Sequence, residues 1–166
     1  MALVPKESNR PPIYLYTDGA SSGNPGPGGY GFILSYNGHE KEGSCGFALT
    51  TNNRMEIMAV IEGLSMLRET CNVNLYSDSK YVIDAIQQGW VYKWEANNWM
   101  RNKKDKAVNV DLWEQLLVLL DEHNVEFHWV KGHAGNPKNE RCDKLAVSAY
   151  LGENLIDDEG YIPEDN

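Results

Sequence analysis

Two short stretches, IYLYTD at residues 13–18 and VNLYSD at residues 73–78, decide the fold of this chain. Each is rich in apolar, aromatic and β-branched residues, as buried strands are, and each ends at an aspartate. In an α/β sheet, ligands bind in the crevice beyond the carboxyl ends of parallel strands. If the two strands are parallel neighbours, Asp18 and Asp78 meet in that crevice. Adjacent carboxylates repel each other, so such a pair shares a proton or holds a divalent cation.

The length and composition indicate a single α/β domain. A chain of 166 residues with 42% apolar residues can bury a sizeable core, and helical and strand patterns alternate along it. No stretch approaches the roughly 20 apolar residues of a membrane span. Residues 1–12 lack a hydrophobic targeting core and are expected to form a disordered leader. The three cysteines form no CxxC pair, which predicts a reduced, cytoplasmic protein without a disulfide framework or a zinc site.

The net charge of −9 is unevenly distributed. Six of the 24 acidic residues lie in an acidic C-terminal tail at residues 152–166, which has no basic residue. Residues 89–109 form a basic arm in which cations are interleaved with Trp90, Trp94 and Trp99. Aromatic and basic side chains together suit a polyanion, whose landing place depends on local charge. The alternative is that the tryptophans form a small satellite core beneath an exposed arm.

The remaining pattern predicts a mixed sheet flanked by helices. Residues 19–29 are rich in Gly and Pro and are expected to form a turn rather than a helix or strand. Strands are expected at 30–36 and up to about 49, joined by a turn at Asn37 and Gly38. With residues 13–18 they would form a three-stranded antiparallel meander, to which 73–78 and 125–130 add two parallel strands. Amphipathic helices are expected at about 54–68, at 79–88, after a capping Asp111, and at 137–150.

Two further carboxylates join the aspartates as candidate ligands. Glu56 lies three residues after Asn53, so a capping pair is the alternative explanation for it. Asp78 could likewise cap the helix that follows it, and Asp143 could be an ordinary surface charge. Taken together, these four carboxylates without cysteine suit a hard cation such as Mg²⁺ or Mn²⁺. Carboxylate-held metal pairs catalyse in-line phosphodiester displacement.

Five ordered blocks resemble bacterial-type ribonuclease H. They are YTDG at 16–19 with GNPGPGGYG at 23–31, TNNRME at 51–56, SDS at 77–79, VDLW at 110–113, and WVKGHAG at 129–135 leading to NERCD at 139–143. The resemblance implies a ribonuclease H-like α/β fold over residues 13–151, with a five-stranded mixed sheet. It also implies an endonuclease that hydrolyses the RNA strand of RNA–DNA hybrids by two-metal-ion catalysis, leaving 5′-phosphate and 3′-hydroxyl ends. Two Mg²⁺ ions, with Mn²⁺ as a substitute, and a monomer without an obligate protein partner are expected.

The resemblance also assigns roles by position. Asp18, Glu56, Asp78 and Asp143 match the metal-binding carboxylates, and His133 matches a loop histidine that assists proton transfer or product departure. The implied substrate contacts are Asn24, Asn52 and Asn53 for the RNA strand, Thr51 and Arg54 near a DNA-strand phosphate, Lys80, and the arm residues Trp90, Trp94, Trp99, Lys103 and Lys104.

The sequence departs from the family pattern in three places. Lys80 stands where the familiar bacterial enzymes carry Gln, residues 95–98 are less basic than usual, and the acidic tail has no counterpart. The tail would be a solvated end or would repel non-specific nucleic acid. Two other hypotheses are a non-catalytic hybrid-binding module and a DNA nuclease of the integrase or Holliday-junction type. The intact carboxylates with His133 oppose the first, and the Asn52–Asn53 pair with the basic arm opposes the second.

Overall fold

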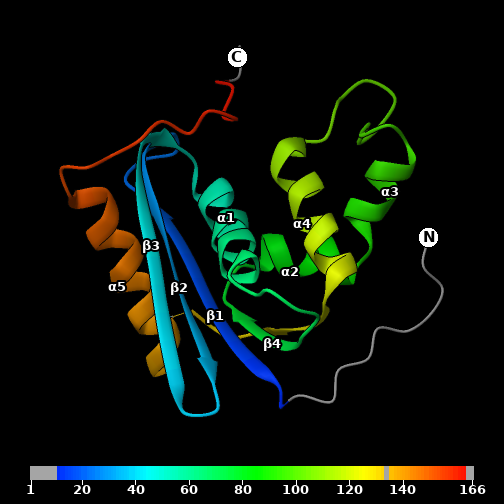
Figure 1. Ribbon diagram of the computed structural model, residues 1–166. Coiled ribbons are helices and arrows are strands. Elements are labelled where there is room, and N and C mark those ends of the chain that lie inside the picture. Colours follow the sequence, from blue (N-terminus) through cyan, green and yellow to red (C-terminus); the bar gives the residue numbers. More distant parts are fainter. Residues whose placement is uncertain (1–10, 133–134, 164–166) are drawn as a thin grey trace.

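The computed structural model describes residues 11–132 and 135–163 (Figure 1). The elements in chain order are β1 (Ile13–Ser21), β2 (Gly26–Tyr36), β3 (His39–Thr50), α1 (Asn52–Ser65), β4 (Asn72–Ser77), α2 (Lys80–Gln87), α3 (Trp90–Ala96), α4 (Val110–Glu122), β5 (Asn124–Trp129) and α5 (Pro137–Leu151). Most of the expected leader lies outside the described residues.

The strands form the five-stranded mixed sheet that the sequence predicts, in the order β3-β2-β1-β4-β5. β1 and β2, and β2 and β3, pair antiparallel, whereas β4 pairs parallel with both β1 and β5. The parallel register sets Leu15 opposite Leu75 and Tyr16 opposite Tyr76. Asp18 and Asp78 each follow the paired tyrosine by two residues, so the two carboxylates lie next to each other, as expected. Asp78 follows the end of β4, but the prediction that the first strand ends at Asp18 is wrong, because Asp18 lies within β1 and pairs with Gly31.

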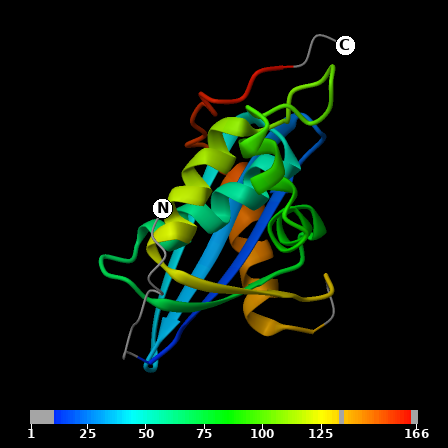
Figure 2. The same ribbon diagram turned by 90° about the vertical axis from the view of Figure 1, so that its right-hand side faces the viewer.

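Helices cover both faces of the sheet. α5 packs on β1, β2 and β3 from one side, and α1 packs on β1 and β2 from the other, with α4 against α1 (Figure 1). The view in Figure 2 shows α5 and α4 on opposite sides of the strands. The core between the sheet and α1 contains fully buried side chains from both, including Leu15, Met55 and Leu75.

The expected turn at residues 19–29 is wrong, because most of these residues belong to strands. β1 continues to Ser21 and β2 begins at Gly26, so that Gly19 pairs with Tyr30 and Ser21 with Gly28. Gly23 lies in the short turn between the strands with a positive φ, whereas the other glycines of the segment allow close packing. A Cβ on Gly19 would collide with the backbone of α1, and one on Gly29 would collide with the Ala146 carbonyl oxygen in α5. Amino-acid composition alone therefore does not distinguish glycines that allow close packing in strands from glycines in turns.

The helix starts differ from those predicted. Thr51 caps α1, since its side chain accepts a hydrogen bond from Arg54 N at 3.2 Å, and Ser79 caps α2 in the same way. Capping therefore explains neither Glu56 nor Asp78. The prediction that Asp111 caps α4 is also wrong, because the N-cap is Asn109 in a left-handed conformation. Asp111 instead lies in the first turn of α4 and pairs with Arg54.

The segment after α5 is folded against the sheet. Residues 152–163, here called the C-terminal strap, run from the end of α5 across the end of β3 (Figure 1). Ile156 forms an isolated parallel bridge with Phe47 of β3. The described part of the acidic tail is therefore seated on the domain. Among the described residues, no helix has the length and apolarity needed to cross a membrane.

Candidate metal centre and nucleic-acid interface

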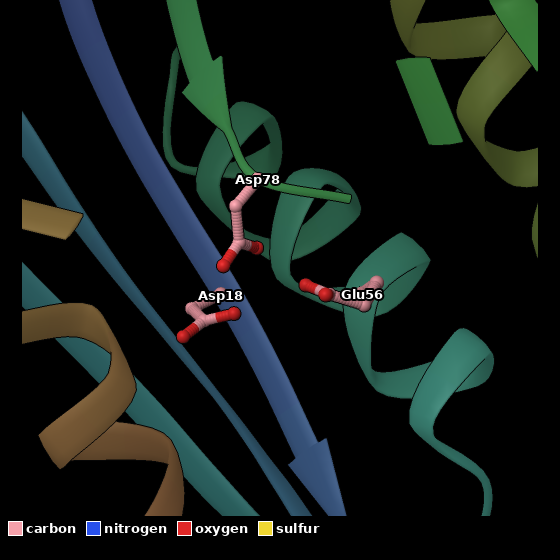
Figure 3. A group of neighbouring side chains, drawn as sticks. All are labelled: Asp18, Glu56 and Asp78. Atoms are coloured by element: carbon pink, nitrogen blue, oxygen red, sulfur yellow. The ribbon is translucent and has the colours of Figure 1, made fainter. Parts of the chain in front are cut away.

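Three of the four predicted carboxylates converge. Asp18 comes from β1, Glu56 from the second turn of α1, and Asp78 from the residue after β4. One ligand oxygen of each lies within 4.8 Å of the others, and Figure 3 shows the three side chains pointing toward one another. The parallel register brings Asp18 and Asp78 together, and the packing of α1 against Gly19 brings Glu56 to them.

Burial makes this cluster unfavourable in its ionised form. Asp18 is 7% exposed and Glu56 is 6% exposed. Burial, followed by the negative charges of Asp78 and Asp143, raises the pKa of Asp18 to about 8, although a hydrogen bond from Gly19 N opposes the shift. Burial and then the charges of Asp18 and Asp78 raise the pKa of Glu56 well above its usual range.

The donor set fits a hard cation. Glu56 Oε1 is buried and has no hydrogen-bond partner among the described residues. Carboxylate oxygens in this number, without sulfur, are the ligands that Mg²⁺ and Mn²⁺ prefer. A bound cation would satisfy the orphaned oxygen and offset the repulsion that raises the two pKa values.

The fourth carboxylate, Asp143, lies at the edge of the cluster. It lines the same small cavity as Asp18 and Asp78, and its charge contributes to the raised pKa of Asp18. It does not belong to the tight group of three. α5 carries it, and α5 is tied to the strand ends by Asn139, whose side-chain amide donates to Thr17 O at 3.3 Å and Tyr76 O at 3.0 Å. Sequence reasoning gave Asn139 no role, although it stands in the NERCD block.

Besides Asn139, Trp129 at the end of β5 also holds the end of β4. Its indole Nε1 donates to the Asp78 carbonyl oxygen at 3.1 Å, and Lys80 Nζ lies 4.5 Å from the centroid of the indole ring. The predicted contact residue Lys80 therefore stands beside the candidate metal centre. His133 lies outside the described residues, and the adjacent Gly132 lines the carboxylate cavity.

The metal-free protein should become less stable as pH rises from about 4 to about 8. An unfolded carboxyl group loses its proton near pH 4, whereas folded Asp18 keeps its proton to about pH 8. Between these values the unfolded chain binds fewer protons, so the free energy of unfolding falls with rising pH. Urea denaturation in a chelator would measure this slope. The slope should be smaller in Asp18→Asn, and equal slopes in the two proteins would contradict the prediction.

The predicted RNA contacts gather around the start of α1. Asn24 Oδ1 in the β1–β2 hairpin accepts a hydrogen bond from Asn52 N at 3.0 Å. Asn24, Thr51 and Asn53 line one cavity of about 900 Å³, here called the Asn24 cavity. Its opposite wall comes from residues 106–111 and from the C-terminal strap. Asn109, which sequence reasoning missed, joins the α4 end of this wall to Tyr81 through a 3.0 Å hydrogen bond.

The Arg54 guanidinium is buried, and its hydrogen-bond donors are used within the protein. Its side chain is 2% exposed and pairs with Asp111 of α4 and Asp158 of the strap. Five hydrogen bonds from the guanidinium, to Asp158, Asp111 and Asn109, use all five of its N–H donors. A direct contact with substrate phosphate, which the resemblance implies, would have no free donor. Arg54 instead fixes the turn that presents Thr51 and Asn53.

The basic arm combines a partly buried base with an exposed tip. Trp94 and Trp99 pack against the main core rather than forming a separate satellite core, whereas Trp90 is 43% exposed on α3. Lys103 and Lys104 are exposed in the loop that a bridge between Met100 and Lys106 closes. Figure 1 shows α3 and this loop beside α4, away from the sheet. The two lysines therefore remain free to meet an external anion.

Comparisons with known proteins agree with this geometry. The family model for RNase H matches residues 10–150. Ribonuclease H of Desulforamulus reducens is 63% identical over 90% of this chain and 94% of its own length, and ribonuclease HI of Synechocystis is 56% identical over 90% and 94%. Among solved structures, LC9-RNase H1 is 31% identical to this chain and has a TM-score of 0.78. It is described as a type 1 RNase H with the type 2 active-site motif, and the match covers 90% of this chain and 76% of that one. The chain therefore belongs to the ribonuclease H family.

Proposed function

We propose that this protein is a metal-dependent endoribonuclease that hydrolyses the RNA strand of RNA–DNA hybrids. One observation carries the proposal: buried carboxylates on β1, α1 and the end of β4 place one oxygen each within 4.8 Å of one another. Membership of the ribonuclease H family, with curated relatives named ribonuclease H over most of their length, supports the choice of reaction. The protein would act as a monomer, and the four carboxylates of one chain would form the site without a second copy.

Asp18, Glu56, Asp78 and Asp143 would hold two Mg²⁺ ions, for which Mn²⁺ could substitute. When bound, such a pair supplies an activated water and neutralises charge on the leaving oxygen during in-line displacement. The central position of Asp18, next to both Asp78 and Asp143, suits a ligand shared by the two ions. Cleavage would leave a 5′-phosphate and a 3′-hydroxyl. His133, in the adjoining loop, would assist proton transfer or product departure.

Substrate recognition would come from two separate surfaces. Asn24, Asn52 and Asn53 present amide groups near the carboxylates, where they could hydrogen-bond to 2′-hydroxyls and so distinguish RNA from DNA. Thr51, at the same helix start, could contact a backbone phosphate. Lys80, held over the Trp129 ring, adds a cation at the metal centre. The arm, with Trp90, Lys103 and Lys104, would bind the DNA strand through charge and stacking.

The direct test is cleavage of a labelled RNA–DNA hybrid in Mg²⁺, beside single-stranded RNA, duplex RNA and duplex DNA. We expect cutting only of the RNA in the hybrid, with 5′-phosphate ends on the products, and none after chelation. Hybrid binding without cutting in either Mg²⁺ or Mn²⁺ would favour a binding module. Cutting of duplex DNA would favour a nuclease of the integrase or Holliday-junction type.

Replacing Lys103 and Lys104 together by Ala should weaken hybrid binding and flatten its salt dependence. Each lysine that neutralises a phosphate contributes about 0.9 to the slope of log K against log salt, so the slope should fall by roughly two. Turnover at saturating hybrid should be unchanged, because the arm is remote from the carboxylates. Binding titrations at several salt concentrations measure the slope. A fall in turnover with unchanged affinity would show that the arm does not serve binding.

A further inference from the structure

The C-terminal strap is seated by backbone pairing. Ala48 N donates to Ile156 O at 2.8 Å and Ile156 N donates to Gly46 O at 3.0 Å, so the strap continues the sheet beyond β3 for one bridge. Ile156 itself is 52% exposed, which means that hydrogen bonds rather than its side chain hold this part. The strap then turns toward the start of α1 and α4 (Figure 2).

Asp158 anchors the strap inside the protein. Its side chain is 3% exposed and accepts hydrogen bonds from Thr50 Oγ1 at 2.7 Å and from Arg54 Nε at 2.7 Å. Two residues later, Gly160 passes directly over the Arg54–Asp111 pair, where an added Cβ would collide with the Asp111 carboxylate. The anchor therefore fixes the direction in which the chain leaves Gly160.

That direction leads into the Asn24 cavity. Residues 160–163 line it together with Asn24, Thr51 and Asn53, and the cation Lys106 stands on the side of the arm. The cavity is thus enclosed by the strap and by the two segments that we propose to bind substrate. Ile162, which is 80% exposed, and Val108, which is 45% exposed, give it an apolar rim.

The charges of the strap are kept away from this cavity. Asp157, Asp158 and Glu159 line a different cavity, next to Glu62 and Gln115. The four residues that face the Asn24 cavity, Gly160 to Pro163, carry no charge. Among the residues that line this cavity, Asp111 carries the one carboxylate, and it is paired with Arg54. An uncharged wall opposite amide groups and a lysine can accept a polyanion, and its apolar side chains match the carbon faces of sugars.

We propose that the C-terminal strap forms one wall of the substrate groove and that Tyr161 and Ile162 contact the sugar–phosphate backbone of the bound hybrid. This inference rests on the proposed function, because it assumes that a hybrid occupies the groove beside Asn24 and Asn53. It makes the strap a determinant of affinity rather than of chemistry. The half-buried Tyr161 supplies a ring and a hydroxyl, and Ile162 supplies an exposed aliphatic surface.

The test is hybrid affinity of a Tyr161→Ala, Ile162→Ala double variant. We expect a rise in Kd of about tenfold, the change that 1.4 kcal/mol produces, with turnover at saturating hybrid within about twofold and an unchanged Tm. The conservative variant Tyr161→Phe, Ile162→Val should keep most of the hybrid affinity of the wild type. Leu151→Ala, which removes a 72% exposed aliphatic side chain that does not line the cavity, should bind as tightly as the wild type.

The outcomes separate this inference from the proposed function. If the wild type cuts the hybrid but the double variant binds it with the same Kd and Tm, the strap is not a wall of the groove, and the proposed function stands. If the wild type neither binds nor cuts the hybrid, the proposed function itself fails. A lower Tm in the double variant with restored affinity at low temperature would also overturn the inference, because the residues would then act through folding.

Discussion

Replacing Asp18 by Asn should abolish cleavage of the hybrid while leaving the metal-free protein at least as stable as the wild type. Asp18 lies between the other carboxylates and is 7% exposed. Asp18 interacts electrostatically with each of the other three carboxylates, so the change to Asn removes the ligand that all of them adjoin. We expect turnover to fall at least about 10³-fold, the upper end of the cost of removing a single preorganised electrostatic group. Hybrid binding should remain, because the amide cluster and the arm are unchanged.

The stability of the same variant should change in the opposite direction. In the wild type, burial and the repulsion from Asp78 and Asp143 raise the pKa of Asp18 to about 8. An amide of similar size removes that repulsion and also lowers the pKa of Glu56 toward its ordinary range, since Asp18 is the largest charge acting on it. Urea denaturation in a chelator at about pH 8 should therefore show an equal or larger free energy of unfolding.

Metal titration completes the Asp18 test. Mg²⁺ should raise the Tm of the wild type by mass action and raise that of Asp18→Asn much less. Glu114→Gln, an exposed carboxylate on α4, serves as the matched control and should behave as the wild type in every assay. Cleavage by Asp18→Asn at the wild-type rate would mean that the cluster is structural.

The sequence predicted the sheet and the carboxylates because both depend on local patterns. Burial alternates along the first half of β1 and along β4, and the inward-facing residues Ile13, Leu15, Val73 and Leu75 are apolar. IYLYTD and VNLYSD show this pattern before their aspartates. Their parallel pairing then follows from the general behaviour of α/β folds, and the register Tyr16 to Tyr76 confirms it. The resemblance added Glu56, which pattern alone could not separate from a helix cap.

Two of the features that the sequence did not predict are determined by distant contacts. Gly19 and Gly29 lie in strands, and they are glycines because α1 and α5 pack too closely for a side chain there. Nothing in the neighbouring sequence distinguishes such packing glycines from turn glycines. Asp158 appears in the sequence as one of several tail acids, yet its partner Arg54 stands 104 residues earlier. A solvated tail and a strap that packs on the domain can have the same composition. The buried Arg54 guanidinium, with which Asp158 pairs, makes this segment a packed strap.

Replacing Asp158 by Ala should destabilise the protein by about 3 kcal/mol, the lower end of the cost of breaking a buried ion pair by removing one partner. Arg54 stays buried and charged, and it loses its hydrogen bonds from Nε and Nη2 to Asp158. Thr50 Oγ1 loses its acceptor as well. The lower end applies because Asp111 remains as a partner and is 39% exposed, which leaves water access to the guanidinium.

Chemical denaturation measures the loss, and two matched variants identify its origin. Asp157→Ala removes a neighbouring exposed carboxylate and should change the free energy of unfolding by less than about 0.5 kcal/mol. Arg54→Met combined with Asp158→Ala should cost less than the sum of the two single changes, because residues in contact are not additive. A loss for Asp158→Ala no larger than that for Asp157→Ala would mean that the strap is not anchored there. Since an unanchored strap cannot hold Tyr161 at the groove, Asp158→Ala should also raise the hybrid Kd by as much as the Tyr161→Ala, Ile162→Ala variant does.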